Sequence, residues 1–224
     1  MQRTKALQYA MPILMVIVIL SIPRSATMAQ QIVGHWNFDE GSGNVVHDSS
    51  GKNNAGEIVS AKWAEGISGK ALAFVDYTSE HPSPDSKKAS YVRIKHSASL
   101  SPTRSFDLSA AINIDASFSP SFVATILQKG EGYGCSYRLL LTKDFKVRVA
   151  AGTEHATLES TTRLTPGKWI SVRASFDGQK LKIFIDGKED ASTAAEVKNF
   201  SNPDDVIIGW RFTGKIDEVR ISVQ

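Results

Sequence analysis

The sequence contains a single cysteine, Cys135, among its 224 residues. One cysteine excludes an intramolecular disulfide, so the fold cannot depend on the disulfide framework that stabilises many small secreted domains. Two interpretations of the thiol remain: a reactive group, or a small residue that is wholly or partly buried. We expect the second.

The chain also lacks runs of charge of one sign. Its 26 Lys and Arg residues against 23 Asp and Glu residues give a formal net charge of +3. Three of the basic residues, Arg3, Lys5 and Arg24, lie in the first 29 residues, which contain no Asp or Glu. The rest of the chain is therefore formally neutral, which argues against binding to nucleic acid or to an anionic membrane surface.

Long apolar runs are absent except at residues 10–22, AMPILMVIVILSI. This run is shorter than the roughly 20 residues that span a bilayer and follows two positive charges, and residues 26–29 offer small side chains for cleavage. The pattern predicts a signal peptide over residues 1–29, removed after Ala29, and hence a secreted or cell-envelope protein. The alternative is an uncleaved N-terminal anchor.

Residues 30–224 are long enough to form one domain with a core of its own. From Gln31 onward no window keeps the period of a helix, whereas apolar residues alternate in short runs. Within residues 168–176, for example, Ile170, Val172 and Ala174 share one face with Phe176. Asp-Gly pairs at 177–178 and 186–187 predict hairpin turns on either side of a strand at 180–186.

The same alternation predicts further strands at residues 32–38, 71–74, 91–94, 106–114, 123–128, 137–141, 145–150, 157–162, 206–209 and 216–223. Many short strands joined by glycine-rich turns indicate an all-β sandwich or barrel. Residues 77–90, YTSEHPSPDSKKAS, form a long polar segment with two prolines, which we expect to be an exposed loop.

Several motifs follow one another in a recognisable order. They are GHWNFDEGSG at 34–43, VHDSSG at 46–51, WAEGISGKALAF at 63–74, YVRI at 91–94, SFDLSA at 105–110, TILQKG at 125–130, PGKW at 166–169, IFIDG at 183–187 and FTGKIDEVRI at 212–221. Together they cover nearly all of residues 30–224 and resemble the laminin-G-like domains of the concanavalin A-like lectin/glucanase superfamily. The resemblance implies an antiparallel jelly-roll β-sandwich of two sheets.

The sequence departs from that family pattern in two places. Ala111 stands where the family usually has a tryptophan, so the sheet must be filled differently there. Trp210 stands where a small residue is common.

Related folds include glycoside hydrolases and polysaccharide lyases, so the fold alone does not exclude an enzyme. Glycoside hydrolysis needs two carboxyl groups about 5 to 9.5 Å apart across the scissile bond. The acidic pair inside a predicted strand, Asp217 and Glu218, points to opposite faces and cannot flank one bond. The five histidines are scattered without metal-ligand spacing, and no phosphate-binding loop is present. We therefore predict a binding module that is not an enzyme.

A structural calcium ion is one expectation for the acidic residues. Simple alternation along residues 216–221 places Asp217 on the same side as Val219 and Ile221, where a carboxylate needs a partner. Calcium takes carboxylate and carbonyl oxygens, and the glycine-containing opening segment supplies Asp39 and Asp48. The family resemblance implies the same ion, held between the N-terminal turn and an Asp of the last strand.

An interpretation without metal is also open. Asp217 then only accepts backbone hydrogen bonds at a β-bulge, and Asp48 forms an ordinary Asx turn.

Sugar recognition needs an exposed aromatic ring for the apolar face of a pyranose and directional partners for its hydroxyls. The tryptophans at 36, 63 and 169 lie in strand motifs and are expected to pack instead. The ligand-binding candidates lie in predicted rim loops and in the long polar loop. They are Trp210, Arg211, Tyr133 and Tyr77.

The predicted partner is a polysaccharide or glycoconjugate. The alternative is another extracellular protein, which laminin-G-like domains also bind, so that the chain acts as an adhesive or scaffold domain. A divergent hydrolase or lyase ranks third.

Overall fold

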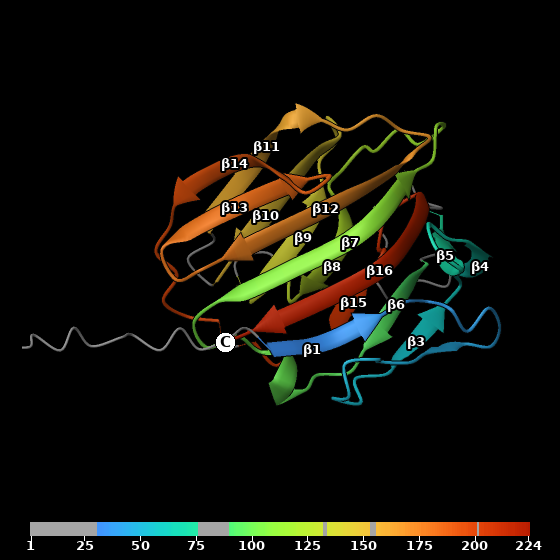
Figure 1. Ribbon diagram of the computed structural model, residues 1–224, viewed down its shortest axis with the longest axis horizontal. Coiled ribbons are helices and arrows are strands. Elements are labelled where there is room, and N and C mark those ends of the chain that lie inside the picture. Colours follow the sequence, from blue (N-terminus) through green and yellow to red (C-terminus); the bar gives the residue numbers. More distant parts are fainter. Residues whose placement is uncertain (1–30, 76–89, 132–133, 153–155, 201) are drawn as a thin grey trace, which may run out of the picture.

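The protein forms two antiparallel β-sheets packed face to face (Figure 1), in a computed structural model that describes residues 31–75, 90–131, 134–152, 156–200 and 202–224. The predicted signal peptide lies outside these residues. No helix in this part of the chain is long and apolar enough to span a membrane. The predicted all-β jelly-roll sandwich is confirmed.

The first sheet has eight strands. Along the sheet they are β14 (Lys188–Ala194), β13 (Lys180–Ile185), β12 (Trp169–Phe176), β7 (Phe106–Ile114), β16 (Gly214–Val223), β5 (Lys70–Phe74) and β4 (Lys62–Glu65), with β1 (Gln31–Trp36) also paired to β16.

The second sheet also has eight strands. They are β11 (Ala156–Arg163), β10 (Lys146–Ala151), β9 (Tyr137–Leu141), β8 (Ala124–Lys129), β15 (Val206–Ile208), β6 (Tyr91–Ile94), β3 (Gly56–Val59) and β2 (Val45–Val46). A short 3-10 turn, η1 (Ala98–Leu100), follows β6.

The core lies between the sheets and follows the predicted alternation. Phe106, Leu108, Ala110, Ile112 and Ile114 of β7 all belong to it, whereas the residues between them point outward or stay outside it. Burying apolar side chains on one face of each sheet is the main force that holds the layers together.

Large aromatic side chains fill the middle of this core. Trp36 is fully buried, and its indole N–H donates to the carbonyl oxygen of Asn54 at 2.8 Å. Phe106 packs against Tyr137 and Phe176, with ring centroids 5.9 and 6.1 Å apart. Cys135 is buried as a free thiol, which confirms its interpretation as a small buried residue. Burial raises the pKa of that thiol.

The first and last strands lie side by side in the first sheet (Figure 1). Strand β16 passes from one partner to another: Gly214–Ile216 pair with β5, and Val219–Val223 pair with β1. The change occurs at a β-bulge between Asp217 and Arg220, where Glu218 has a left-handed φ of 52°. A bulge of this kind reorients the side chains that precede it.

The bulge corrects the predicted direction of Asp217. Asp217 lies opposite Ala111 of β7, which belongs to the outward row of that strand, whereas Val219 and Ile221 point into the core. Simple alternation was therefore wrong here, because the extra residue at Glu218 reverses the pattern.

The structure contains strands that the sequence pattern did not predict, β2, β3, β4 and β14. Strand β14 is mostly exposed on both faces, so its residues show no apolar alternation. It is nevertheless joined to β13 by the predicted turn, in which Asp186 and Gly187 have φ values of 49° and 78°. These values fit the tight turn that two antiparallel strands prefer.

Gly209 allows a close approach between the sheets. A Cβ atom at Gly209 would lie 2.3 Å from the Phe74 ring, whereas one at Gly187 would meet nothing within 4 Å. Both glycines have φ near +80°, so alanine is strained at both. We predict that Gly209→Ala lowers the free energy of unfolding by about 2–4 kcal/mol and Gly187→Ala by about 1 kcal/mol. Equal losses in urea denaturation would show that the Phe74 contact is unimportant.

Candidate functional site

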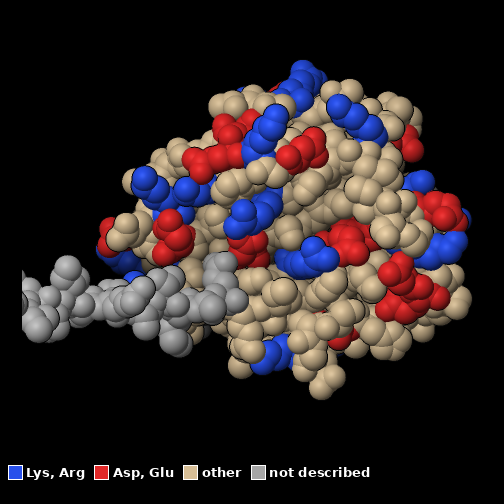
Figure 2. Space-filling view, viewed as in Figure 1, with Lys and Arg blue, Asp and Glu red and all other residues tan. Residues whose placement is uncertain are grey.

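The outer face of the first sheet is covered by ion pairs. Arg173 of β12 contacts Asp107 of β7 with N···O distances of 2.7 and 3.0 Å, and its guanidinium lies over the Phe184 ring. Lys182 and Glu189 pair at 3.0 Å. Figure 2 shows this face with basic and acidic side chains interspersed. Because these charged side chains pair with one another, few of them remain available to bind a charged ligand.

The outer face of the second sheet is organised differently. One row of directly opposed residues runs across seven of its strands. In order from β3 to β11 they are Glu57, Arg93, Ile207, Gln128, Arg138, Ala150 and Thr157. Opposed residues in neighbouring strands point to the same side, so these side chains form a continuous strip.

A cavity of about 370 Å³ opens on this strip, and we name it the Arg138 cavity. Its lining consists of Val123, Arg138, Leu140, Arg148, Ala150, Thr157, Leu158 and Glu159. Leu140 and Ala150 are almost fully buried although they point away from the core, so they lie beneath the cavity, and the half-buried Val123 and Leu158 supply its accessible apolar surface. Charged and hydroxyl side chains surround that surface. A volume of this size with a few polar groups is typical of small-molecule sites.

A second hollow of about 220 Å³ adjoins the Arg138 cavity and shares Val123, Arg148 and Glu159 with it. Phe122 lies in its wall and is 42% exposed. The guanidinium of Arg211 lies over the Phe122 ring, 5.3 Å from its centroid. The hollow therefore connects the Arg138 cavity with the segment that contains the predicted ligand-binding residues.

Trp210 and Arg211 lie next to this strip. Trp210 is partly buried and packs against Tyr91 and Ile207 on the outer side of the sheet, and Arg211 lies 4.6 Å above the indole. The indole N–H is buried and has no hydrogen-bond partner among the residues that the structure describes. Trp210 thus packs on the outer surface of the second sheet, and the guanidinium of Arg211 covers one face of its ring.

Two other predicted ligand-binding residues, Tyr77 and Tyr133, lie outside the described residues. Their role in ligand binding stays a prediction.

A further cavity of about 340 Å³, the Arg93 cavity, lies along the same strip between Arg93, Gln128, Glu131 and Asp204. Arg93 donates to the hydroxyl of Tyr91 at 3.2 Å, and its Nε lies 4.0 Å from Asp205. Three carboxylates and one arginine line this cavity, so its net charge is negative, whereas the net charge of the Arg138 cavity is positive.

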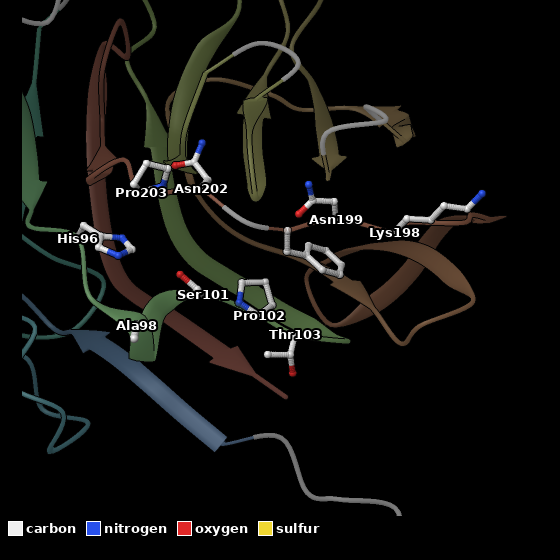
Figure 3. Close-up of a pocket in the computed structure, with 10 residues that line it drawn as sticks. His96, Ala98, Ser101, Pro102, Thr103, Lys198, Asn199, Asn202 and Pro203 are labelled. Carbon is white, nitrogen blue, oxygen red and sulfur yellow. The ribbon is translucent and has the colours of Figure 1, made fainter.

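The end cavity, of about 660 Å³, lies between η1 and the segment before β15 (Figure 3). Its polar groups are committed to the protein: the Asn202 amide donates to the carbonyl oxygen of Gly134 and, at 3.1 Å, to Asp204. His96 Nδ1 lies 2.8 Å from the buried ammonium of Lys129, which can only donate. These bonds hold the loop onto the sheet.

Two of the three predicted calcium residues meet at one turn. The turn of residues 66–70 is closed by a hydrogen bond from Gly66 N to Gly69 O at 3.1 Å. Asp39 accepts from Lys70 N and Asp217 accepts from Ile67 N, both at 3.0 Å. A Cβ at Gly69 would lie 2.1 Å from Asp39, and one at Gly66 would lie 2.5 Å from Asp217.

Asp217 is fully buried. Desolvation raises the pKa of its carboxyl group, although backbone hydrogen bonds from Glu218, Ile67 and Ser68 oppose the shift, and Glu218 adds repulsion. No cation among the described residues pairs with it. A buried carboxylate without a counter-charge is the kind of group that a bound cation stabilises.

Asp48 is held elsewhere. Its carboxylate accepts hydrogen bonds from His35 N, Ser50 N, Ser50 Oγ and Asn54 N, all between 2.9 and 3.0 Å. This is the arrangement of the Asx turn. Across the described residues, no three His, Cys, Asp or Glu side chains are grouped to hold a metal ion. Asp48 therefore does not join Asp39 and Asp217.

Glu40 adds one unexplained oxygen near this turn. Its Oε1 accepts from His47 N at 2.6 Å, whereas its Oε2 is buried and has no hydrogen-bond partner in the described part of the chain. Figure 2 shows acidic side chains gathered at the edge where β1 ends. Glu40 does not form a group of three with Asp39 and Asp217, so the oxygen ligands that calcium prefers would come from these two carboxylates and from backbone carbonyl groups of the turn.

A laminin G family model, described as the concanavalin A-like lectin/glucanases superfamily, matches residues 85–223, which is more than half of the chain. The chain belongs to the concanavalin A-like lectin/glucanases superfamily. The matched range includes Asp217 and every residue of the second-sheet strip except Glu57, whereas Asp39 and Asp48 lie before it. No curated protein matches the chain in sequence.

Solved structures share the fold of this superfamily member at low identity. The binding domain of Paraclostridial Mosquitocidal Protein 1 is 12% identical, with a TM-score of 0.69, over 87% of this chain and 49% of that one. The binding domain of botulinum neurotoxin serotype D is 13% identical, with a TM-score of 0.66, over 87% and 48%. This chain spans about half the length of these toxin domains.

A third structure is matched over most of its own length. It is domain 4 of the extracellular arabinanase AbnA from Geobacillus stearothermophilus, in complex with arabinotriose. It is 18% identical, with a TM-score of 0.64, over 87% of this chain and 93% of that one. At this identity the likeness shows a shared fold.

Sequence reasoning missed Arg138 and Arg148, both of which line the Arg138 cavity. A signal was present for Arg138, which stands in the otherwise apolar strand YRLLL at 137–141. An arginine in such a strand is expected to point away from the core and to bind an acidic or polar partner on the outer face.

The four donors to Asp48 give its carboxylate a measurable role. Desolvation raises its pKa, but the hydrogen bonds from Asn54, His35 and Ser50 outweigh that effect and lower it below the usual 3.8. A carboxyl group with a lowered pKa stabilises the fold above its unfolded pKa, and this contribution is lost as the pH falls through the lowered value.

We predict that Asp48→Asn lowers the free energy of unfolding by about 1–2 kcal/mol at pH 7, a modest value because the group is partly exposed. The difference from the wild type should shrink below about pH 3.8. Denaturation of both proteins across pH 2–7 measures it, with the exposed Asp144→Asn as the control. A difference that does not change with pH would contradict the hydrogen-bonded carboxylate.

Proposed function

We propose that this chain is an exported, non-catalytic carbohydrate-binding module whose glycan binds on the outer face of the second sheet, in the Arg138 cavity. The observation that carries the proposal is the cavity's construction. Val123 and Leu158 provide accessible apolar surface above the buried Leu140 and Ala150, and Arg138, Thr157 and the Arg148–Glu159 pair surround it. A sugar ring presents the matching combination of an apolar face and a rim of hydroxyl groups.

The surrounding groups can serve a sugar in both hydrogen-bonding directions. Glu159 accepts from Arg148 Nε at 2.8 Å and has further acceptor capacity on its second oxygen. The Thr157 hydroxyl both donates and accepts, and the guanidinium of Arg138 donates. Trp210 and Phe122 extend the surface beyond the cavity, where a longer chain would lie. Domain 4 of the arabinanase, bound to arabinotriose, supports a glycan on this fold.

The arrangement supports binding without catalysis. The cavity lining contains one carboxylate, Glu159, and it is ion-paired with Arg148. Hydrolysis of a glycosidic bond requires two carboxyl groups with different roles, one protonated and one ionised. Glu159 is ion-paired with an arginine, which favours its ionised form, so it does not serve as a proton donor. The lining offers no second carboxyl group to complete a catalytic pair.

Blocking the cavity tests the proposal. Thr157 is exposed on β11, and a tryptophan there would fill the cavity without removing a core side chain. We predict that wild type binds glycans on an array and that Thr157→Trp weakens this binding at least ten-fold, about 1.4 kcal/mol.

Thr193→Trp is the matched control, because Thr193 is equally exposed but lies on β14 of the other sheet. It should bind as the wild type does. An array without signal for the wild type would overturn the proposal, and equal binding by Thr157→Trp would move the site elsewhere.

We also propose that a structural calcium ion binds at the 66–70 turn, held by Asp39 and Asp217 with the help of backbone carbonyl oxygens. The ion would supply the positive charge that the buried Asp217 lacks. Since Asp217 stands where β16 changes partners from β5 to β1, the ion would join the two ends of the chain.

We predict that removing calcium with EGTA lowers the melting temperature by several degrees, because an ion at 100 times its Kd adds about 2.7 kcal/mol. Asp217→Ala should melt lower and lose the response to EGTA. Asp48→Ala should also melt lower but keep the response, because its carboxylate serves only the Asx turn. A wild-type melting curve that is identical in calcium and in EGTA would remove the metal.

A further inference from the structure

Arg138 differs from three other arginines of the sheet surfaces in what it meets. Arg148 pairs with Glu159, Arg173 with Asp107, and Arg220 with Glu218. Arg138 forms no ion pair with any described residue. Its one hydrogen bond there runs from Nε to the side-chain oxygen of Gln128 at 3.2 Å. Four of its five N–H groups therefore have no acceptor among the described residues.

The guanidinium is held in place before any ligand arrives. Gln128 is buried, and its oxygen also accepts from the Thr125 hydroxyl at 3.0 Å, which fixes the amide. Arg138 lies between Gln128 and Ala150 in the strip, so small or fixed side chains flank it on both neighbouring strands. Preorganisation of this kind reduces the entropy lost when a partner binds.

The described surroundings offer this arginine no carboxylate in ion-pair contact, although Glu131 acts on it from further away. Desolvation is the main cause that lowers the pKa of Arg138, and repulsion from Arg148 adds to it, while Cys135 and Glu131 act in the opposite direction. Arginine nevertheless stays protonated in proteins. The cavity thus contains two guanidinium groups against the single carboxylate of Glu159.

We infer that the Arg138 cavity is an acidic-sugar subsite, in which the planar guanidinium of Arg138 binds a carboxylate or sulfate ester carried by a ring that packs on the accessible apolar lining of the cavity. This inference rests on the proposed function and specifies its ligand class. Arginine matches the two oxygens of a carboxylate or sulfate with two parallel N–H donors. A neutral sugar would leave the second guanidinium without an anion.

The test compares three oligosaccharide probes of equal length by isothermal titration calorimetry: an oligogalacturonate, the same oligosaccharide with its carboxyl groups reduced to alcohols, and a sulfated galactan fragment. We expect the wild type to bind one of the acidic probes at least ten-fold more tightly than the neutral one. The first and third probes distinguish a carboxylate from a sulfate ester. The preference should weaken as sodium chloride is raised, because salt screens the ion pair.

Arg138→Gln should lose the acidic preference while it keeps the affinity for the neutral probe. Arg138→Lys retains the charge without the planar fork and should keep a reduced preference, which guards against a folding defect in the first variant. Lys188→Gln, on exposed β14, removes a charge from the other sheet and should change nothing.

Each outcome decides. Equal affinity for acidic and neutral probes, or a preference that survives in Arg138→Gln, overturns the acidic subsite and leaves the glycan-binding function standing. Absence of binding to every probe by the wild type, together with an empty glycan array, overturns both.

Discussion

The sandwich depends on how its last strand divides between two partners. Strand β16 pairs with β7 along its length, and on its other side it meets β5 first and β1 afterwards. Antiparallel pairing of the first and last segments encloses the core and satisfies backbone groups that would otherwise form an open sheet edge. The bulge at Glu218 makes this exchange possible, and it also turns the Asp217 carboxylate outward onto the 66–70 turn, where Asp39 holds the other end.

Local patterning was sufficient wherever burial alone decided the structure. Strand β7 was predicted with its observed ends, 106–114, because five of its side chains alternate into the core. Strand β14 escaped prediction because an edge strand that is exposed on both faces needs no apolar period. Alternation also failed for Asp217, because it assumes a regular strand. A β-bulge depends on the pairing with the strands on either side, which the local sequence pattern does not show.

The candidate site could be predicted only in part for a related reason. A tryptophan in a loop signals a ligand surface, and Trp210 does lie on the outer face of the second sheet. The feature that singles out Arg138 is that it forms no ion pair with any described residue. This can be recognised only once the positions of the neighbouring strands are known. The register across β8, β9 and β10 places Gln128 and Ala150 beside Arg138, and no carboxylate.

The two proposed sites lie on opposite sides of the core, and this separation constrains their roles. Asp217 lies on the outward row of the first sheet, whereas Arg138 lies on the outward row of the second, with the full thickness of the packed sheets, about 10 Å between their backbones, separating them. A cation at the 66–70 turn therefore cannot touch a ligand in the Arg138 cavity. The proposed ion would stabilise the junction of β1, β5 and β16, and so act on the fold that positions the second sheet. A glycan bound as proposed would be recognised without that ion, by side chains such as Arg138, which forms no ion pair with any described residue.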